Sequence, residues 1–149
     1  MEDLIRMATR EDAANISELI VNTLRVSNGR DYSPDVIEQV QRSFSPQAVL
    51  GLLGKRQVYV ATLNQHIVAT ASLDQDVVRS VFVEPGCQGK GLGKRLMERL
   101  QSVAVSQGFT KLHVPSSITA EGFYRSLGFD RVRDEYHGAE RTIIMQKQW

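Results

Sequence analysis

Apolar residues recur at helical spacing in the first third of the chain. A short strand is expected over residues 4–8, and Thr9 with the acids that follow it predicts a helix start with a side-chain cap. That helix reaches about Val26, and its buried positions are Ala13, Ile16, Leu19, Ile20 and Leu24. Ser33-Pro34 predicts a second helix, because serine suits the cap and proline suits the first helical position. Its buried stripe is Val36, Ile37, Val40 and Phe44.

From residue 57 the apolar period becomes two, which predicts strands. Two of them, near 58–60 and over 67–73, form a hairpin with Asn64 and Gln65 in its turn, and a third covers 77–83. The order continues with a helix over about 89–106, a strand over 110–114 and a short helix over 120–127. It ends with strands over 129–134 and 142–146. The sequence therefore predicts an α/β (α+β) fold with a strand, a glycine-rich turn, a helix and a strand at its centre.

Length and composition narrow the class of protein. The 149 residues suit one domain over 1–149, and 42% hydrophobic with 23% charged residues is a globular composition. Lys plus Arg number 18 and Asp plus Glu number 17, which gives a net charge of +1. The overall electrostatic field of the protein therefore does not favour binding to a nucleic acid or an anionic membrane. The single cysteine, Cys87, excludes an internal disulfide and a cysteine metal cage. With no leader or membrane span visible, a cytoplasmic protein without a metal is expected.

The glycine-rich turn after the strand over 77–83 has the features of an anion site. A strand that leads through glycines into a helix brings free main-chain N–H groups and the positive end of a helix together, and Lys90, Lys94 and Arg95 add positive charge. A Walker loop is excluded, because Arg95 follows Gly93-Lys94 and Gln88 stands where the first glycine belongs. A dinucleotide fingerprint is excluded too, because Lys94 occupies its third small position.

This turn resembles the coenzyme A turn of the GNAT N-acetyltransferases, Gln/Arg-x-x-Gly-x-Gly/Ala. Gln88, Gly91 and Gly93 match it, after Val83-Glu84-Pro85 at the end of the strand. Residues 117–129 resemble the second motif of the family, Asn-x-x-Ala-x-x-Phe/Tyr-Tyr followed by Gly-Phe, with Ser117 in place of the asparagine. Alone, the glycine-rich motif is also typical of an ordinary turn, and the second motif is also typical of a core helix with a glycine cap. Their joint occurrence, one helix and one strand apart, identifies the chain as a member of the family.

The resemblance implies a fold, a cofactor and an activity. The fold would be a mixed, mostly antiparallel sheet of about six to seven strands with about four helices. The activity would be transfer of the acetyl group of acetyl-CoA to a primary amine of a small molecule or peptide. Val83 N–H would stabilise the oxyanion, and Tyr124 would protonate the departing thiolate. The expected cofactor-binding residues are Phe82, Val83, Gln88, Gly89, Lys90, Gly91, Leu92, Gly93, Lys94, Ser117, Phe123 and Tyr124.

The sequence assigns neither the acceptor amine nor the general base. Tyr32 and Asp31, between the first two helices, and Glu84 are candidate substrate contacts, and a Tyr-Ser-Pro placement at 32–34 resembles a bacterial subgroup of small GNAT proteins. Glu84, Asp76 and His113 are candidate bases, each with a structural alternative, and Cys87 is interpreted as a packing residue. The alternatives are acetylation of a protein N-terminus or lysine, and a catalytically silent acyl-CoA sensor. A homodimer is compatible with the habit of the family.

Overall fold

A computed structural model describes residues 4–149. A seven-stranded sheet forms the centre of the molecule. Its strand order is β1-β2-β3-β4-β5-β7-β6, and every neighbouring pair is antiparallel except β4 and β5. The strands are β1 (Leu4–Met7), β2 (Gln57–Leu63), β3 (His66–Asp74), β4 (Val77–Val83), β5 (Lys111–Ser117), β6 (Asp130–His137) and β7 (Glu140–Gln148).

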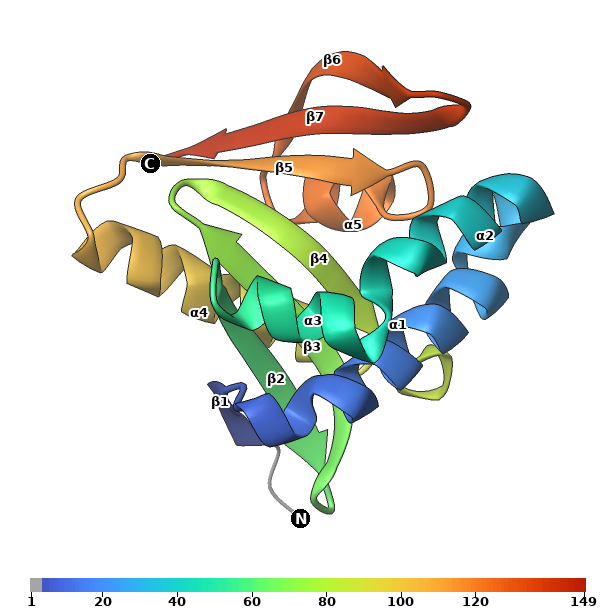
Figure 1. Ribbon diagram of the computed structural model, residues 1–149. Helices are drawn as coiled ribbons and strands as arrows, with labels where there is room; N and C mark the ends of the chain where they lie inside the picture. The colour runs from blue at the N-terminus through green and yellow to red at the C-terminus, as the bar shows by residue number, and fades with distance from the viewer. Residues whose placement is uncertain (1–3) are drawn as a thin grey trace.

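Helices cover both faces of this sheet. One face carries α1 (Ala13–Val26), α2 (Pro34–Gln41) and α3 (Pro46–Leu53), and the other carries α4 (Leu92–Ser106), as Figure 1 shows. The short α5 (Glu121–Ser126) follows β5 and packs into the same core as α4. Successive side chains of β2 point to opposite faces of the sheet and so enter the cores under both helical layers. Val58 and Val60 pack towards α1 and α3, whereas Tyr59 and Ala61 pack towards α4. No helix among the described residues is both long and apolar enough to cross a membrane.

Serine caps start two of the helices. Ser33 Oγ accepts a hydrogen bond from Val36 N–H at 3.3 Å, as the sequence predicts for α2. The pair Ser45-Pro46 repeats that signal at α3, where Ser45 Oγ accepts from Ala48 N–H at 3.2 Å. Sequence analysis did not predict α3, because its largely apolar residues lack a clear helical stripe.

Thr9 begins the 3-10 turn that runs into α1, as predicted, and forms a capping box with Asp12. Asp12 closes the preceding 3-10 turn, η1 (Arg10–Asp12), and its carboxylate accepts from the N–H of Thr9 at 2.7 Å and from the Thr9 hydroxyl at 3.2 Å. The same carboxylate receives two bonds from the Arg6 guanidinium, at 2.8 and 3.0 Å. Thr9 and Asp12 thus cap the turn together, and the Arg6 guanidinium adds charge-assisted hydrogen bonds to the acid.

A bulge in β4 opens the sheet at its centre. Ser72 pairs with Arg79 and Thr70 pairs with Phe82, so β4 carries one more residue than β3 over this stretch, and Ser80 takes a left-handed φ of 57°. Beyond the single pair Val77 and His113, β4 and β5 make no further ladder contact. Because a bulge bends its strand, the two parallel strands separate towards their carboxyl ends.

Candidate functional site

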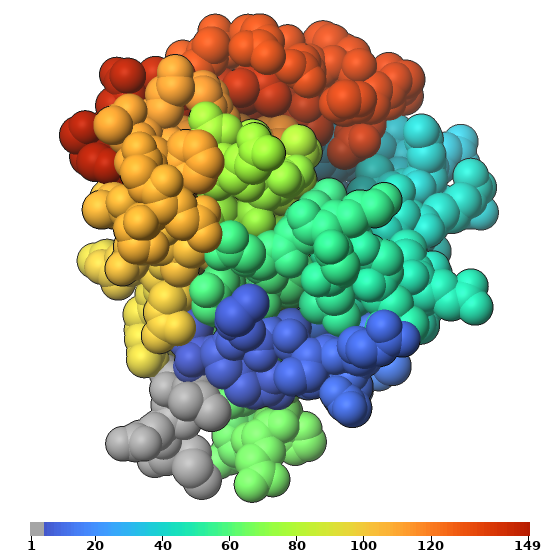
Figure 2. Space-filling view, turned by 60° about the vertical axis from the view of Figure 1, so that its left-hand side comes forward, coloured from blue at the N-terminus to red at the C-terminus, as the bar shows by residue number. Residues whose placement is uncertain are grey.

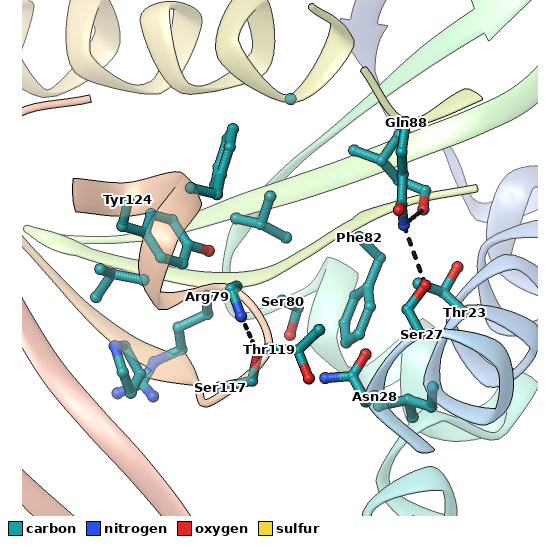
Figure 3. Close-up of a pocket in the computed structure, with 18 of the residues that line it drawn as sticks. Thr23, Ser27, Asn28, Arg79, Ser80, Phe82, Gln88, Ser117, Thr119 and Tyr124 are labelled. Carbon is teal, nitrogen blue, oxygen red and sulfur yellow. Dashed lines mark hydrogen bonds between the residues drawn. The ribbon is translucent and has the colours of Figure 1, made fainter. Parts of the chain in front are cut away.

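A cavity of about 840 Å³ occupies the gap between β4 and β5. It begins at the glycine-rich turn and the first residues of α4, passes the ends of β4 and β5, and extends beneath α1 and α2 to the β6–β7 turn. Figure 3 shows Gln88 and Phe82 along the cavity, with Tyr124, Ser117 and Arg79 across from them. A single continuous space thus connects both faces of the sheet.

The glycine-rich turn presents main-chain N–H groups to one end of this cavity. Gly89 and Gly91 have φ of 83° and 81°, a region that side chains strongly disfavour, so the turn needs glycine at both positions. The first helical hydrogen bond of α4 runs from Arg95 N–H to Gly91 C=O at 3.0 Å. The N–H groups of Leu92, Gly93 and Lys94 precede it and have no acceptor within the helix. Lys94 also lines the cavity, so this end suits a phosphorylated ligand.

Gly93 has a different reason to be glycine. A Cβ at this position would lie 3.0 Å from Cζ of Phe123 and 3.4 Å from Cγ2 of Val83. The start of α4 is therefore packed directly on α5 and on the end of β4. This close approach fixes the turn relative to Val83 and Tyr124, which lie next to those contacts.

The peptide of Val83 faces the gap and not β3. Glu84 N–H donates to Val68 C=O at 2.8 Å, and antiparallel pairing alternates, so the main-chain groups of Val83 point the other way. In agreement, Val83 C=O accepts from Gln88 Nε2 at 3.1 Å, outside the sheet ladder. Val83 N–H is thus available at the edge of the cavity, as the resemblance implies.

Tyr124 lies on α5 with its ring buried and its hydroxyl directed into the cavity (Figure 3). Phe123 and Phe129 meet the ring edge to face, with centroids 5.1 and 5.7 Å away. Burial raises the pKa of the Tyr124 hydroxyl above its ordinary value, so the phenol stays protonated at neutral pH. The hydroxyl has no hydrogen-bond partner among residues 4–149 and can donate to a ligand.

Two predicted cofactor contacts have structural partners of their own. Ser117 Oγ accepts from Ala120 N–H at 3.1 Å and so holds the turn before α5. Gln88 Nε2 donates to Ser27 Oγ at 3.1 Å, besides its bond to Val83, and ties the glycine turn to the end of α1. Both side chains line the cavity.

Of the three predicted substrate residues, only Tyr32 lines the cavity. The Tyr32 hydroxyl donates to Arg141 C=O at 2.6 Å and accepts from Ile118 N–H at 2.8 Å, and Tyr32 lines the cavity wall. Asp31 accepts from Thr119 Oγ1 at 2.7 Å and is not part of the lining. Glu84 is outside the lining too, where its carboxylate accepts a weak bond from Cys87 Sγ at 3.4 Å.

The three candidate bases lie away from the cavity. His113 contacts Gln146 at 3.0 Å and Asp76 at 3.6 Å, at the end of β4 and β5 where the strands are still paired. Among the described residues, the one carboxylate that lines the cavity belongs to Glu140, which sequence analysis missed because an acid at a hairpin carries no local signal. Burial raises the pKa of Glu140, while nearby His137 opposes that shift.

The structure brings most of the predicted cofactor residues together. The cavity lining includes every one of them except Lys90. It also contains residues with no sequence signal: Arg56, Arg79 and Ser80. Within residues 4–149 no cluster of three His, Cys, Asp or Glu side chains could hold a metal ion.

Comparison with known proteins points to one family. A family profile described as "Acetyltransferase (GNAT) domain" matches residues 28–147. Serotonin N-acetyltransferase 2 of the rice Oryza sativa subsp. japonica is 42% identical over 62 residues, which are 42% of this chain and 31% of that protein. The chain thus matches about a third of the length of the rice protein. The uncharacterized N-acetyltransferase YafP of Escherichia coli is 25% identical over 127 residues, 83% of this chain and 79% of that protein.

Solved structures share the fold over the whole chain. A GCN5-related N-acetyltransferase of Rhodopseudomonas palustris superposes with a TM-score of 0.94 at 22% identity, covering 100% of this chain and 97% of that one. The PaiA N-acetyltransferase of Thermoplasma acidophilum, solved in complex with coenzyme A, superposes with a TM-score of 0.85 at 18% identity and covers both chains fully. The seven-stranded sheet, its opening beside β4 and the profile match agree that this chain belongs to the GNAT acetyltransferase family.

Proposed function

We propose that this protein transfers the acetyl group of acetyl-CoA to a primary amine by direct attack, with Tyr124 as the general acid. The observation that supports this most strongly is the position of the buried Tyr124 hydroxyl. It points into a cavity that also contains the amides of the glycine turn. One chain thus offers an anion site and a proton donor along the same space.

Residues at the α4 end of the cavity fit the coenzyme. The N–H groups of Leu92, Gly93 and Lys94 and the Lys94 ammonium would hold its diphosphate. Phe82 and Val83 would line the path of its pantetheine arm between β4 and β5. Acetyl-CoA supplies the acetyl group as an activated thioester, and the protein needs only to position and polarise it.

The chain's own groups then act around the end of β4. The amine nitrogen forms the new bond to the acetyl carbon as the bond to sulfur breaks. Val83 N–H stabilises the negative charge on the carbonyl oxygen. Tyr124 donates its proton to the departing sulfur, and the amine loses one proton, which the Glu140 carboxylate is suited to accept directly or through water.

The first test substitutes Tyr124 by phenylalanine. The ring and its packing remain, so we expect an unchanged affinity for acetyl-CoA and a kcat that falls by about ten- to a thousandfold. Tyr136, whose side chain is exposed, provides the matched control as Tyr136→Phe. Calorimetry measures the affinity, and thiol release with a panel of amines measures turnover. Equal turnover by Tyr124→Phe and the wild type would remove the general-acid role.

The same assays separate the alternatives. Binding of acetyl-CoA without transfer to any amine, peptide or protein would favour an acyl-CoA sensor. Transfer restricted to peptides or proteins would favour acetylation of an N-terminus or a lysine. No heat of binding from a folded sample would leave the proposal without its donor.

A further inference from the structure

The wall of the cavity also carries polar groups away from the glycine turn. These charged and polar groups come from segments far apart in the chain and are Arg30, Arg56, Arg79, Ser80, His137 and Glu140. Phe44 and Phe82, in edge-to-face contact with centroids 5.7 Å apart, add an apolar wall on the α1–α3 side. This part of the wall has the mixed polar and apolar lining of a small-molecule site.

Arg56 is held in this wall by the bulge of β4. It stands directly before β2, and its Nη1 donates to Ser80 Oγ at 3.2 Å. Ser80 has a left-handed φ of 57° in the bulge. The Arg56 side chain is half-buried, and no carboxylate among the described residues forms an ion pair with it. A half-buried guanidinium without a direct ion pair is costly unless nearby negative charge offsets it, and Asp74 acts on Arg56 only from a distance.

Arg79 adds a second guanidinium to the same wall. It contacts Asp74 at 3.6 Å across the β3–β4 hairpin and lines the cavity together with Arg56. Burial lowers the pKa of Arg56 most, the charge of Arg79 lowers it further, and the charge of Asp74 opposes both. Asp74 offsets only one of the two arginine charges. The pair is therefore preorganised for an anion.

We propose that the acceptor is a small amine that also carries a carboxylate or phosphate group, and that Arg56 and Arg79 bind this group beside the bulge of β4. The inference rests on the proposed acetyl transfer and adds the class of its acceptor. Glu140, the acid of the cavity wall, is suited to contact the amino group of such a molecule. A protein N-terminus, which has a peptide bond in place of the nearby carboxylate, lacks the group that this arginine pair binds.

Matched acceptors test the proposal. L-amino acids are compared with their carboxamides, and phosphoethanolamine with ethanolamine, by thiol release at saturating acetyl-CoA. We expect at least one anionic acceptor to exceed its uncharged partner in kcat/KM by about tenfold or more. The pair that shows the preference distinguishes carboxylate from phosphate as the bound group. Equal or better use of the uncharged partners would overturn the inference and leave the acetyltransferase function in place.

Variants assign the preference to the two arginines. Arg56→Gln and Arg79→Gln should each lower kcat/KM for the preferred acceptor by about ten- to a hundredfold, mainly through KM. Both should lower kcat/KM for its uncharged partner several-fold less than this, so the preference between the two acceptors shrinks. Arg56→Lys keeps the charge without the fork and should recover only part of the loss. Arg10→Gln, at an exposed arginine outside the cavity, is the control.

Two further readouts keep the outcomes distinct. Thermal melting of each variant without ligands detects a purely structural role of the arginines. A lowered melting temperature together with equal losses of kcat/KM on charged and uncharged acceptors would contradict a role in binding the anionic group. Calorimetry with the preferred acceptor measures its Kd directly, and an unchanged Kd in both glutamine variants would also contradict it. Failure of acetyl-CoA to bind the wild type is a different result, because it removes the proposed function itself.

Discussion

At the scale of single residues, the site depends on atoms that touch across elements. Gly93 matches the last glycine of the family turn, yet its φ is not left-handed, unlike that of Gly89 and Gly91. Its requirement comes from Phe123 and Val83, which occupy the space of a side chain. The sequence identified the glycine, and only the packing gives the reason for it.

Substituting Gly93 by alanine should separate cofactor binding from stability. Alanine favours a helix by up to about 1 kcal/mol over glycine, while overpacking costs about 1–3 kcal/mol, so the net change in the free energy of unfolding is small. The displaced Phe123 and Val83 line the cavity, so affinity for acetyl-CoA should fall by about tenfold. Calorimetry measures this, with Gly86→Ala as the control, since an added Cβ there meets nothing within 4 Å. Equal affinities in the two variants would contradict the packing argument.

At the scale of elements, one carboxylate connects β1, η1 and the start of α1. The hydrogen bonds from Arg6, together with those from Thr9, lower the pKa of Asp12 to about 2 from its usual 3.8. A folded-state pKa below the unfolded one stabilises the protein above the unfolded pKa, and that stability is lost as pH falls. A shift of this size corresponds to about 2 kcal/mol, since one pKa unit is about 1.4 kcal/mol.

Asp12→Asn should therefore destabilise the protein by about 2 kcal/mol at pH 7. The difference from the wild type should shrink as pH falls from about 5 towards 2, where the wild-type carboxyl becomes protonated. Urea unfolding at several pH values measures both curves. Asp35→Asn, at an exposed acid of α2, serves as the control. A gap that stays constant over this pH range would show that Asp12 stabilises the fold through something other than its charge.

At the scale of the whole molecule, the β6–β7 hairpin and α2 lie side by side although a hundred residues separate them, as Figures 1 and 2 show. The Tyr32 hydroxyl connects the loop before α2 to β7 and to the segment after β5. This connection closes the wall of the cavity near Glu140 and Thr142, both of which line it. The proposed acceptor side thus depends on long-range contacts, whereas the proposed coenzyme site depends on one strand, turn and helix.

Removing this connection should affect stability and acceptor binding together. Tyr32→Phe leaves the C=O of Arg141 and the N–H of Ile118 without a partner, which costs about 1–3 kcal/mol. KM for the acceptor should rise, while the affinity for acetyl-CoA stays near that of the wild type. Chemical unfolding and steady-state kinetics measure the two effects, again beside Tyr136→Phe. An acceptor KM equal to that of the wild type would place Tyr32 outside the acceptor site.

The sequence by itself determined the fold class and predicted the residues that line one side of the cavity, since that signal is local. Turn glycines, the strand before them and the motif over 117–129 are contiguous, and all the predicted cofactor residues except Lys90 line the cavity. It did not determine which residues form the proposed acceptor side of the cavity. Arg56, Ser80 and Glu140 come from a turn, a bulge and a hairpin, and each is unremarkable within its own segment. Only the folded sheet decides which of these side chains face one cavity, because their proximity is set by strand register and by one extra residue in β4.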